Sequence, residues 1–214
     1  IKTRIVIIGG GFAGVATAEK LEHLFGSDPS VAFTIVSDVN ALLFTPMLAE
    51  VAGGSLEPTH ISSPLRTSLH RTDVVHERVE QIDTTQKRVI LAASGPNAQR
   101  RELPYNHLVL AVGSVSNYLG LAGVEANAFD FKTLTDAIYL RNHIITLLEQ
   151  ADQETDPARR QALLTFVIAG AGFAGAELAG AMNDFMRGSL PYYPNIPTDE
   201  ARVIVIHSRE RILP

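Results

Sequence analysis

The chain has 214 residues, of which 46% are hydrophobic and 19% charged, ordinary values for a soluble globular protein with material for one large or two modest domains. Its formal net charge of −5 argues against a nucleic-acid partner, because no basic stripe is present to neutralise phosphates. The chain contains no cysteine, which excludes disulfides, thiolate nucleophiles and thiolate metal sites and fits a reducing, cytoplasmic location. No apolar run reaches the roughly 18 residues expected of a membrane-spanning helix.

The first predicted element is a strand that ends in a glycine-rich turn. Residues 4–8 are mostly β-branched, residues 9–14 contain Gly-x-Gly-x-x-Gly, and residues 15–25 have helical spacing and end at Gly26 as a C-cap. Strand, turn and helix in this order are the context that a dinucleotide fingerprint requires. The first glycine permits the tight turn, the second lets the backbone approach a pyrophosphate, and the third lets the helix pack closely.

The second predicted strand, residues 31–36, is followed by Ser37 and Asp38. An acid at this strand end accepts hydrogen bonds from ribose hydroxyls, so Asp38 is a candidate; a turn or cap aspartate is the alternative. Residues 41–48 are more apolar than a surface loop, which indicates core packing or a segment under a cofactor. Arg66 is either a surface charge or a partner for phosphate or carboxylate.

The hydrophobic period then changes. Residues 74–82 and 88–92 alternate as strands, and a turn at residues 94–97 separates them from residues 101–103, which predicts a small antiparallel meander inserted in the α/β unit. The apolar run at residues 108–113 predicts another buried strand. This strand ends in small residues, where the backbone can approach a ligand.

The second half repeats the opening pattern. After a helix at residues 135–150 with Thr135 as its N-cap and a surface connection at 152–157, residues 164–175 form a second strand and Gly-x-Gly-x-x-Gly turn. A helix at 176–187 and a strand at 202–206 follow. A single copy is weak evidence, because glycine turns also occur for structural reasons. Two copies in matching context predict two nucleotide-binding units, whose usual purpose is to pass a hydride between dinucleotides.

We therefore predict an α/β fold with two Rossmann-like dinucleotide-binding units. The first covers residues 1–115, with the meander at about 74–104, and the second covers residues 116–214. The second unit has only two predicted strands, so we expect it to be the N-terminal part of a longer domain.

The order and spacing of these motifs resemble type II NADH:quinone oxidoreductases, within the FAD-dependent pyridine nucleotide-disulphide oxidoreductases. The resemblance covers nearly the whole chain. It comprises an FAD fingerprint, a segment beneath the flavin, a second FAD motif, the start of an inserted NADH domain, an NADH fingerprint and a motif after the next strand, at residues 9–14, 43–66, 105–114, 131–142, 170–179 and 211–214.

The resemblance implies FAD as cofactor, NADH or NADPH as co-substrate and a quinone as acceptor. The candidate cofactor-binding residues are Gly9, Gly11, Phe12, Ala13, Gly14, Ser37, Asp38, Pro46, Val79, Ala111, Val112 and Gly113 in the first unit, and Gly170, Gly172, Phe173, Ala174, Gly175, Glu177 and His207 in the second. The seven histidines are too scattered to form a metal site.

Glu177 is the catalytic candidate, because it lies two places beyond the third glycine, near the nicotinamide carboxamide or the flavin. The corresponding residue of the first unit is Ala16. The alternative is a first-turn acid stabilised by the helix dipole. Glu50 falls where the family often has glutamine, and a solvated loop glutamate is the preferred interpretation over a role in quinone protonation.

Two residues depart from the family pattern. The family's strand-end acid falls on Ser37 in the first unit, one place before Asp38, and on His207 in the second. A carboxylate accepts the ribose 2′-hydroxyl and repels a 2′-phosphate, whereas His207, Ser208, Arg209 and Arg211 tolerate or favour the phosphate. The choice between NADH and NADPH therefore stays open.

The remaining family regions would lie beyond Pro214: the rest of the NADH domain, the last FAD motif and the membrane-binding helices. We expect peripheral contact with the inner face of the cell membrane through that region only, and no activity from this length alone; a homodimer is a further expectation. The alternatives are a ferredoxin-reductase-like flavoprotein and a non-catalytic dinucleotide-binding fragment. Sulfide:quinone and disulfide reductases are disfavoured because they need cysteines.

Overall fold

A computed structural model describes residues 2–93 and 100–213, so the turn predicted at residues 94–97 lies outside the described residues. The chain forms two compact units. Unit 1 contains Ile1–Leu43 and Ser62–Val115, and unit 2 contains Phe44–Ile61 and Ser116–Pro214. Among residues 2–93 and 100–213, each helix is too short or too polar to span a bilayer.

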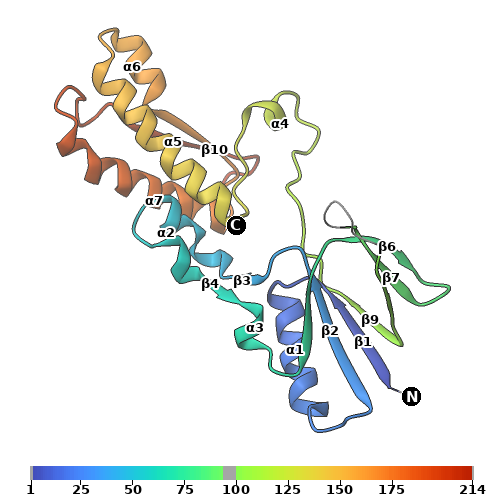
Figure 1. The fold of residues 1–214 in the computed structure, drawn as a ribbon. Helices are drawn as coiled ribbons and strands as arrows, with labels where there is room; N and C mark the ends of the chain where they lie inside the picture. The colour runs from blue at the N-terminus through green and yellow to red at the C-terminus, as the bar shows by residue number, and fades with distance from the viewer. Residues whose placement is uncertain (1, 94–99, 214) are drawn as a thin grey trace. The chain divides into compact units, whose positions relative to one another are not determined.

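A four-stranded parallel sheet organises unit 1 (Figure 1). Its strands, in spatial order β5-β2-β1-β9, are Thr72–His76, Val31–Ser37, Thr3–Ile8 and His107–Leu110. In chain order this is the arrangement 3-2-1-4 of a dinucleotide-binding fold, with helix α1 (Phe12–Phe25) crossing from β1 to β2. The carboxyl ends of all four strands therefore meet at one edge.

Both faces of this sheet are covered, because successive side chains of a strand point to opposite faces. Ile7 joins Val15 and Ala18 of α1 and Leu65 of α3 (Leu65–Ser68) on one face. Val6 and Ile8 pack on the other face against the meander. The continuous apolar run in β1 is thus that of a strand buried on both sides.

The antiparallel meander consists of β6 (Val79–Asp83), β7 (Arg88–Leu91) and β8 (Glu102–Pro104). The prediction that residues 74–82 form one meander strand was wrong. Residues 72–76 are β5 of the parallel sheet, paired with β2, and the chain turns before β6 begins at Val79. The alternation runs through both strands, so the pattern alone concealed the break.

The segment 44–61 leaves unit 1 through one strand of a small antiparallel pair and returns through the other. These strands are β3 (Ala41–Leu43) and β4 (Ser62–Pro64). Between them lie η1 (Thr45–Met47), α2 (Leu48–Ala52) and η2 (Pro58–Ile61). The buried residues of α2 pack against helices of unit 2, so this part of the predicted first domain belongs by its contacts to unit 2.

Unit 2 is built on a pair of parallel strands, β10 (Thr165–Ala169) and β11 (Arg202–Ile206). Helix α7 (Phe173–Ser189) connects them and packs on both, and α2 packs against α7 and α5 (Leu134–Gln153). The other elements of the unit are α4 (Val124–Asn127), α6 (Pro157–Leu163) and η3 (Leu190–Tyr192). Two strands were predicted here, and two are observed among the described residues.

The N-cap of α5 is Thr133, not the predicted Thr135. The Thr133 hydroxyl accepts a hydrogen bond from Asp136 N at 3.1 Å, and the Asp136 carboxylate accepts one from Thr133 N at 2.7 Å. This reciprocal capping box satisfies two amides at the helix start. The surface connection predicted at 152–157 contains Asp156, which caps α6.

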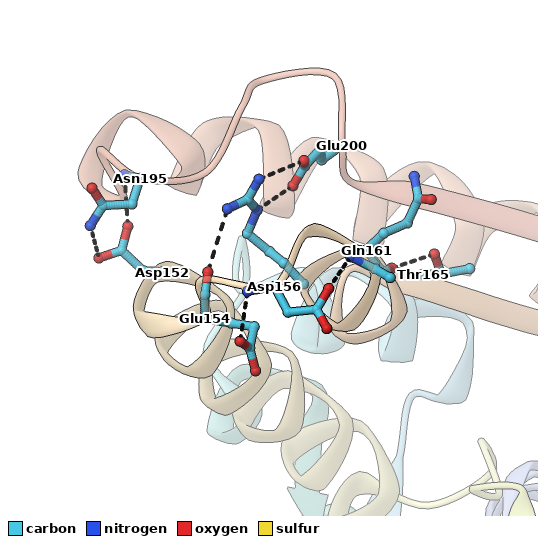
Figure 2. Close-up of polar contacts among 9 residues, drawn as sticks. Asp152, Glu154, Asp156, Gln161, Thr165, Asn195 and Glu200 are labelled. Carbon is cyan, nitrogen blue, oxygen red and sulfur yellow. Dashed lines mark hydrogen bonds and ion pairs between the residues drawn. The ribbon is translucent and has the colours of Figure 1, made fainter.

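Polar contacts hold the loop before β11 in place (Figure 2). Arg160 of α6 donates two hydrogen bonds to the Glu200 carboxylate, at 2.7 and 2.9 Å, and Asn195 donates two to Asp152. Arg202 N then donates to Leu164 O at 2.9 Å, which starts the pairing of β11 with β10. These contacts fix the start of β11. Its register with β10 then determines which residues at the carboxyl end of β11 lie beside the glycine turn.

Candidate dinucleotide sites at two glycine turns

The first glycine turn lies at the carboxyl edge of the unit 1 sheet, between β1 and α1. Gly9 has φ +109°, a left-handed conformation that side chains rarely adopt, and its amide donates to Val36 O at 2.8 Å. Gly11 is the N-cap of α1, with φ −82° and ψ −170°. Gly14 is buried in the first turn of the helix, where an added Cβ would collide with the Gly9 carbonyl oxygen.

The second turn reproduces this geometry. Gly170 has φ +110° and donates its amide to Ile206 O at 2.8 Å. Gly172 is the N-cap of α7, with φ −74° and ψ −175°, and a Cβ on Gly175 would collide with the Gly170 carbonyl oxygen. The repeated sequence thus encodes the same backbone twice, in two separate units.

The second glycine of each turn faces open space. In the part of the chain that the structure describes, a Cβ on Gly11 or on Gly172 would have no heavy atom within 4 Å beyond its chain neighbours. Neither N-cap has a side chain that could cap the first amides of its helix, which leaves room for an external acceptor there. This is the arrangement that admits a phosphate: exposed backbone at the N-terminus of a long helix, with the positive end of its dipole outward.

Two strand ends flank the turn of unit 1. The Ala111 amide, just beyond β9, donates to Ile8 O at 2.8 Å, and a Cβ on Gly9 would collide with the Ala111 carbonyl oxygen. Val112 is 70% exposed, and Gly113 has φ +70°. On the β2 side Ser37 is buried, its Oγ accepting from Val39 N at 3.2 Å, while Asp38 is exposed. The predicted residues of these two strand ends are therefore at one edge of the sheet.

Two further candidates assigned to the first unit lie in other elements. Val79 belongs to the meander and packs against the apolar cluster beneath the sheet. Pro46 lies in η1, exposed, within unit 2. Arg66, considered as a phosphate partner, instead donates to Val74 O at 2.7 Å and holds α3 on β5.

Several side chains at the glycine turn of unit 2 are exposed to solvent. Phe173 is 75% exposed, and Ala174 and Glu177 are exposed too. Glu177 is the fifth residue of α7, beyond its first turn, which has no acid. A stabilising effect of the helix dipole falls off over that distance, so the dipole accounts poorly for this carboxylate.

His207 follows β11 directly and is half-buried; its Nδ1 accepts a hydrogen bond from Arg209 N at 3.4 Å. The next contact was not foreseen from the sequence: Leu213 N donates to Ala171 O at 3.0 Å, which brings the segment after His207 back to the glycine turn. The close packing around Gly10 was not foreseen from the sequence either: a Cβ there would lie 2.7 Å from Ser37 Oγ. No sequence signal announces either contact.

Two observations bear on other chemistry. Glu50, on α2, has a buried carboxylate oxygen with no hydrogen-bond partner among the residues that the structure describes, which a solvated loop glutamate would not show. Among residues 2–93 and 100–213, no group of three or more metal-ligating side chains is close enough to hold an ion.

The sheet order of unit 1, its glycine turn and the matching turn of unit 2 define a dinucleotide-binding α/β protein. The chain belongs to the pyridine nucleotide-disulphide oxidoreductase family, whose model matches residues 3–214. Both the predicted fold class and the family resemblance are thereby confirmed.

Curated relatives narrow the likeness. The chain is 33% identical over 215 residues to the type II NADH:quinone oxidoreductase Ndh of Mycobacterium tuberculosis, and 31% identical over 214 residues to a probable NADH dehydrogenase of Dictyostelium discoideum. These alignments take in 99% and 98% of this chain but only 45% and 46% of the relatives. The chain therefore spans about half the length of the relatives it matches.

Among solved structures, the fold is similar to that of NDH2 from Plasmodium falciparum in complex with NADH. The TM-score is 0.84 at 20% identity, over 96% of this chain and 41% of that one. At this identity the likeness supports the fold alone.

Proposed function

We propose that this chain forms part of a flavoprotein that oxidises NAD(P)H through FAD and passes the electrons to a quinone. Unit 1 would hold FAD and unit 2 the nicotinamide nucleotide. The observation that carries the proposal is the pair of glycine turns, alike in φ, in hydrogen bonding and in open space, each at a strand-to-helix junction. One turn has many uses; two such turns in separate units are typical of a protein that couples two dinucleotides.

In unit 1, Gly9, Gly11 and Gly14 would place the first amides of α1 against the FAD pyrophosphate. Asp38 would accept hydrogen bonds from the ribose, and the backbone of residues 111–113 would lie beside the cofactor. In this class the flavin supplies the redox chemistry, so the protein contributes binding and orientation. The open space at Gly11 fits a binding role, and the close backbone contacts of Gly9 and Gly14 fit a role in holding the turn in shape.

In unit 2, Gly170, Gly172 and Gly175 would hold the pyrophosphate of NAD(P)H on α7. We propose Glu177 as the catalytic candidate, because it is an exposed acid at a place where the matching residue of unit 1 is Ala16. Its role would belong to the nicotinamide site specifically, since the rest of the turn is common to both units.

The quinone acceptor rests on the relatives, whose names describe NADH:quinone oxidoreductases. Residues 1–214 contain no cysteine, so this part of the protein supplies no redox-active cysteine pair for an acceptor reaction. Peripheral membrane contact and a homodimer remain predictions for the whole protein.

The test starts with the colour and contents of the purified protein. We expect flavin absorbance, release of one FAD per chain on denaturation by mass spectrometry, and NAD(P)H oxidation supported by a soluble quinone but not by ferredoxin when the whole protein is assayed. Gly11→Ala and Gly172→Ala, matched changes in the two turns, should separate the sites: the first removes FAD, and the second spares FAD but weakens nicotinamide nucleotide binding. Colourless protein that binds adenine nucleotides alone would contradict the enzyme and favour a binding module.

A further inference from the structure

The two units differ most at the strand end beside the glycine turn. In each unit the first glycine donates to the last paired residue of the neighbouring strand, Gly9 to Val36 and Gly170 to Ile206, both at 2.8 Å. Ser37 and His207 therefore occupy equivalent places, and so do Asp38 and Ser208. Unit 1 presents a carboxylate at this edge, whereas unit 2 presents an imidazole and a hydroxyl.

The segment 207–213 is fixed against the turn at both ends. It begins after Ile206, bound to Gly170, and it ends at Leu213, whose amide donates to Ala171 O at 3.0 Å. Inside it, Arg209 N donates to His207 Nδ1 at 3.4 Å. Because Gly170 and Ala171 are consecutive, the segment closes into a loop next to the N-terminus of α7.

This loop is basic. It contains Arg209 and Arg211 against one acid, Glu210, while the equivalent seven residues of unit 1, 37–43, contain Asp38 as their single charge. Both arginines are exposed, and neither takes part in an ion pair with another residue that the structure describes. Glu177, on α7, is a further acid close in sequence to the turn. The guanidinium groups are therefore available to an external anion.

We infer that unit 2 prefers NADPH to NADH, with the 2′-phosphate bound by His207, Ser208 and Arg209. This inference rests on the proposed function, because it assumes that unit 2 binds a nicotinamide nucleotide. A strand-end carboxylate selects the free 2′-hydroxyl, and none stands at position 207. An arginine nearby supplies the charge-assisted hydrogen bonds that a phosphate takes, and the hydroxyl of Ser208 is a further donor.

The test measures binding rather than turnover, by calorimetric titration of the FAD-saturated protein with NADP⁺ and with NAD⁺. We expect the wild-type protein to bind NADP⁺ about tenfold more tightly or better. Arg209→Ala should weaken NADP⁺ roughly 10- to 100-fold, as for loss of a charge-assisted hydrogen bond, and leave NAD⁺ within about twofold. His207→Glu should reverse the preference.

Arg202→Ala is the matched control. It removes one positive charge from the opposite end of β11, away from the turn, and should leave both affinities unchanged. Equal or tighter binding of NAD⁺ by the wild-type protein would overturn the NADPH preference while leaving the proposed function intact. Failure of both nucleotides to bind would overturn the proposed function as well. If Arg209→Ala weakened the binding of NADP⁺ and NAD⁺ equally, Arg209 would not contact the 2′-phosphate, and the inference would be wrong on that point.

Discussion

The roles of the second and third glycines of the first fingerprint, Gly11 and Gly14, can be distinguished by experiment, because their surroundings in the structure differ. Gly14→Ala places a methyl group against a backbone atom, whereas Gly11→Ala places one in open space. We predict that the first variant loses stability and that the second keeps its stability but loses its cofactor. The pair thus distinguishes a glycine required by the fold from one required by the ligand.

The cost of Gly14→Ala follows from what the new Cβ meets. Alanine is favoured over glycine in a helix by up to about 1 kcal/mol. Against this gain, the methyl group would overlap the Gly9 carbonyl oxygen, which is backbone held by a strand and cannot rotate away as a side chain would. Overpacking costs about 1–3 kcal/mol where neighbours can adjust, and more where they cannot. We therefore expect the free energy of unfolding to fall by at least about 2 kcal/mol.

Gly11→Ala carries no such collision. Its φ of −82° is ordinary for alanine, and the smaller backbone entropy of the unfolded chain offsets the poorer N-cap, so the free energy of unfolding should change by less than about 1 kcal/mol. The methyl group would nevertheless occupy the face that a pyrophosphate must approach. We expect the variant to purify without FAD.

Urea unfolding of the FAD-free proteins and the flavin absorbance of the purified ones provide the two measurements. A stability loss in Gly11→Ala as large as that in Gly14→Ala would refute the division of roles. So would full FAD occupancy in Gly11→Ala, because the open space would then not be the pyrophosphate site.

Three further predictions concern the scaffold. Burial raises the pKa of Glu22, but hydrogen bonds from the Thr72 hydroxyl and from three amides outweigh it and leave the pKa below its usual value, so Glu22→Gln should cost about 1–3 kcal/mol at pH 7 in urea unfolding. A carboxyl group whose pKa is lower in the folded protein than in the unfolded chain stabilises the fold while it is ionised. The difference in unfolding free energy between the wild-type protein and Glu22→Gln should therefore be complete above pH 4.5 and shrink as the pH falls below it. Removing the hydroxyl cap of α5 with Thr133→Ala should cost about 1 kcal/mol, whereas Thr135→Ala, in the same turn, should cost almost nothing; equal effects would argue against the capping box. The hydrogen bond from Arg160 lowers the pKa of Glu200, so a double-mutant cycle on this pair should show a favourable coupling at pH 7 that disappears in acid.

The parts of the fold that could be predicted are those whose signal is local. A β-branched run, Gly-x-Gly-x-x-Gly and a helical period fixed β1 and α1, and again β10 and α7, because each glycine answers a steric demand within a few residues. Asp38 and His207 could be placed at strand ends for the same reason. Their position beside the turn follows from parallel pairing alone.

Some failures required a partner distant in sequence, whereas the misplaced N-cap was a local choice between two neighbouring threonines. Thr133 and Thr135 are both plausible caps by type, and the choice depended on the side chain of Asp136 reaching back to one of them. The association of α2 (Leu48–Ala52) with unit 2 rests on packing against α5, which begins at Leu134, and α7, which begins at Phe173. An apolar sequence pattern does not indicate which distant helix it will pack against. The buried oxygen of Glu50 is invisible for the same reason.

The equality of the two glycine turns has a consequence for specificity. Gly9 and Gly170 have φ of +109° and +110°, and Gly11 and Gly172 have φ of −82° and −74°, so under the proposed function both turns would recognise what FAD and NAD(P)H share, which is a pyrophosphate attached to adenosine. Such a cradle cannot by itself direct one dinucleotide to each unit. The choice must come from residues that the copies do not share, and at the adenosine end these are the strand-end pairs: Ser37 and Asp38 in one unit, His207 and Ser208 in the other. Exchanging these pairs while leaving both turns intact should therefore change which nucleotide each unit binds, as measured by calorimetric titration, and should leave the free energy of unfolding of the protein nearly unchanged.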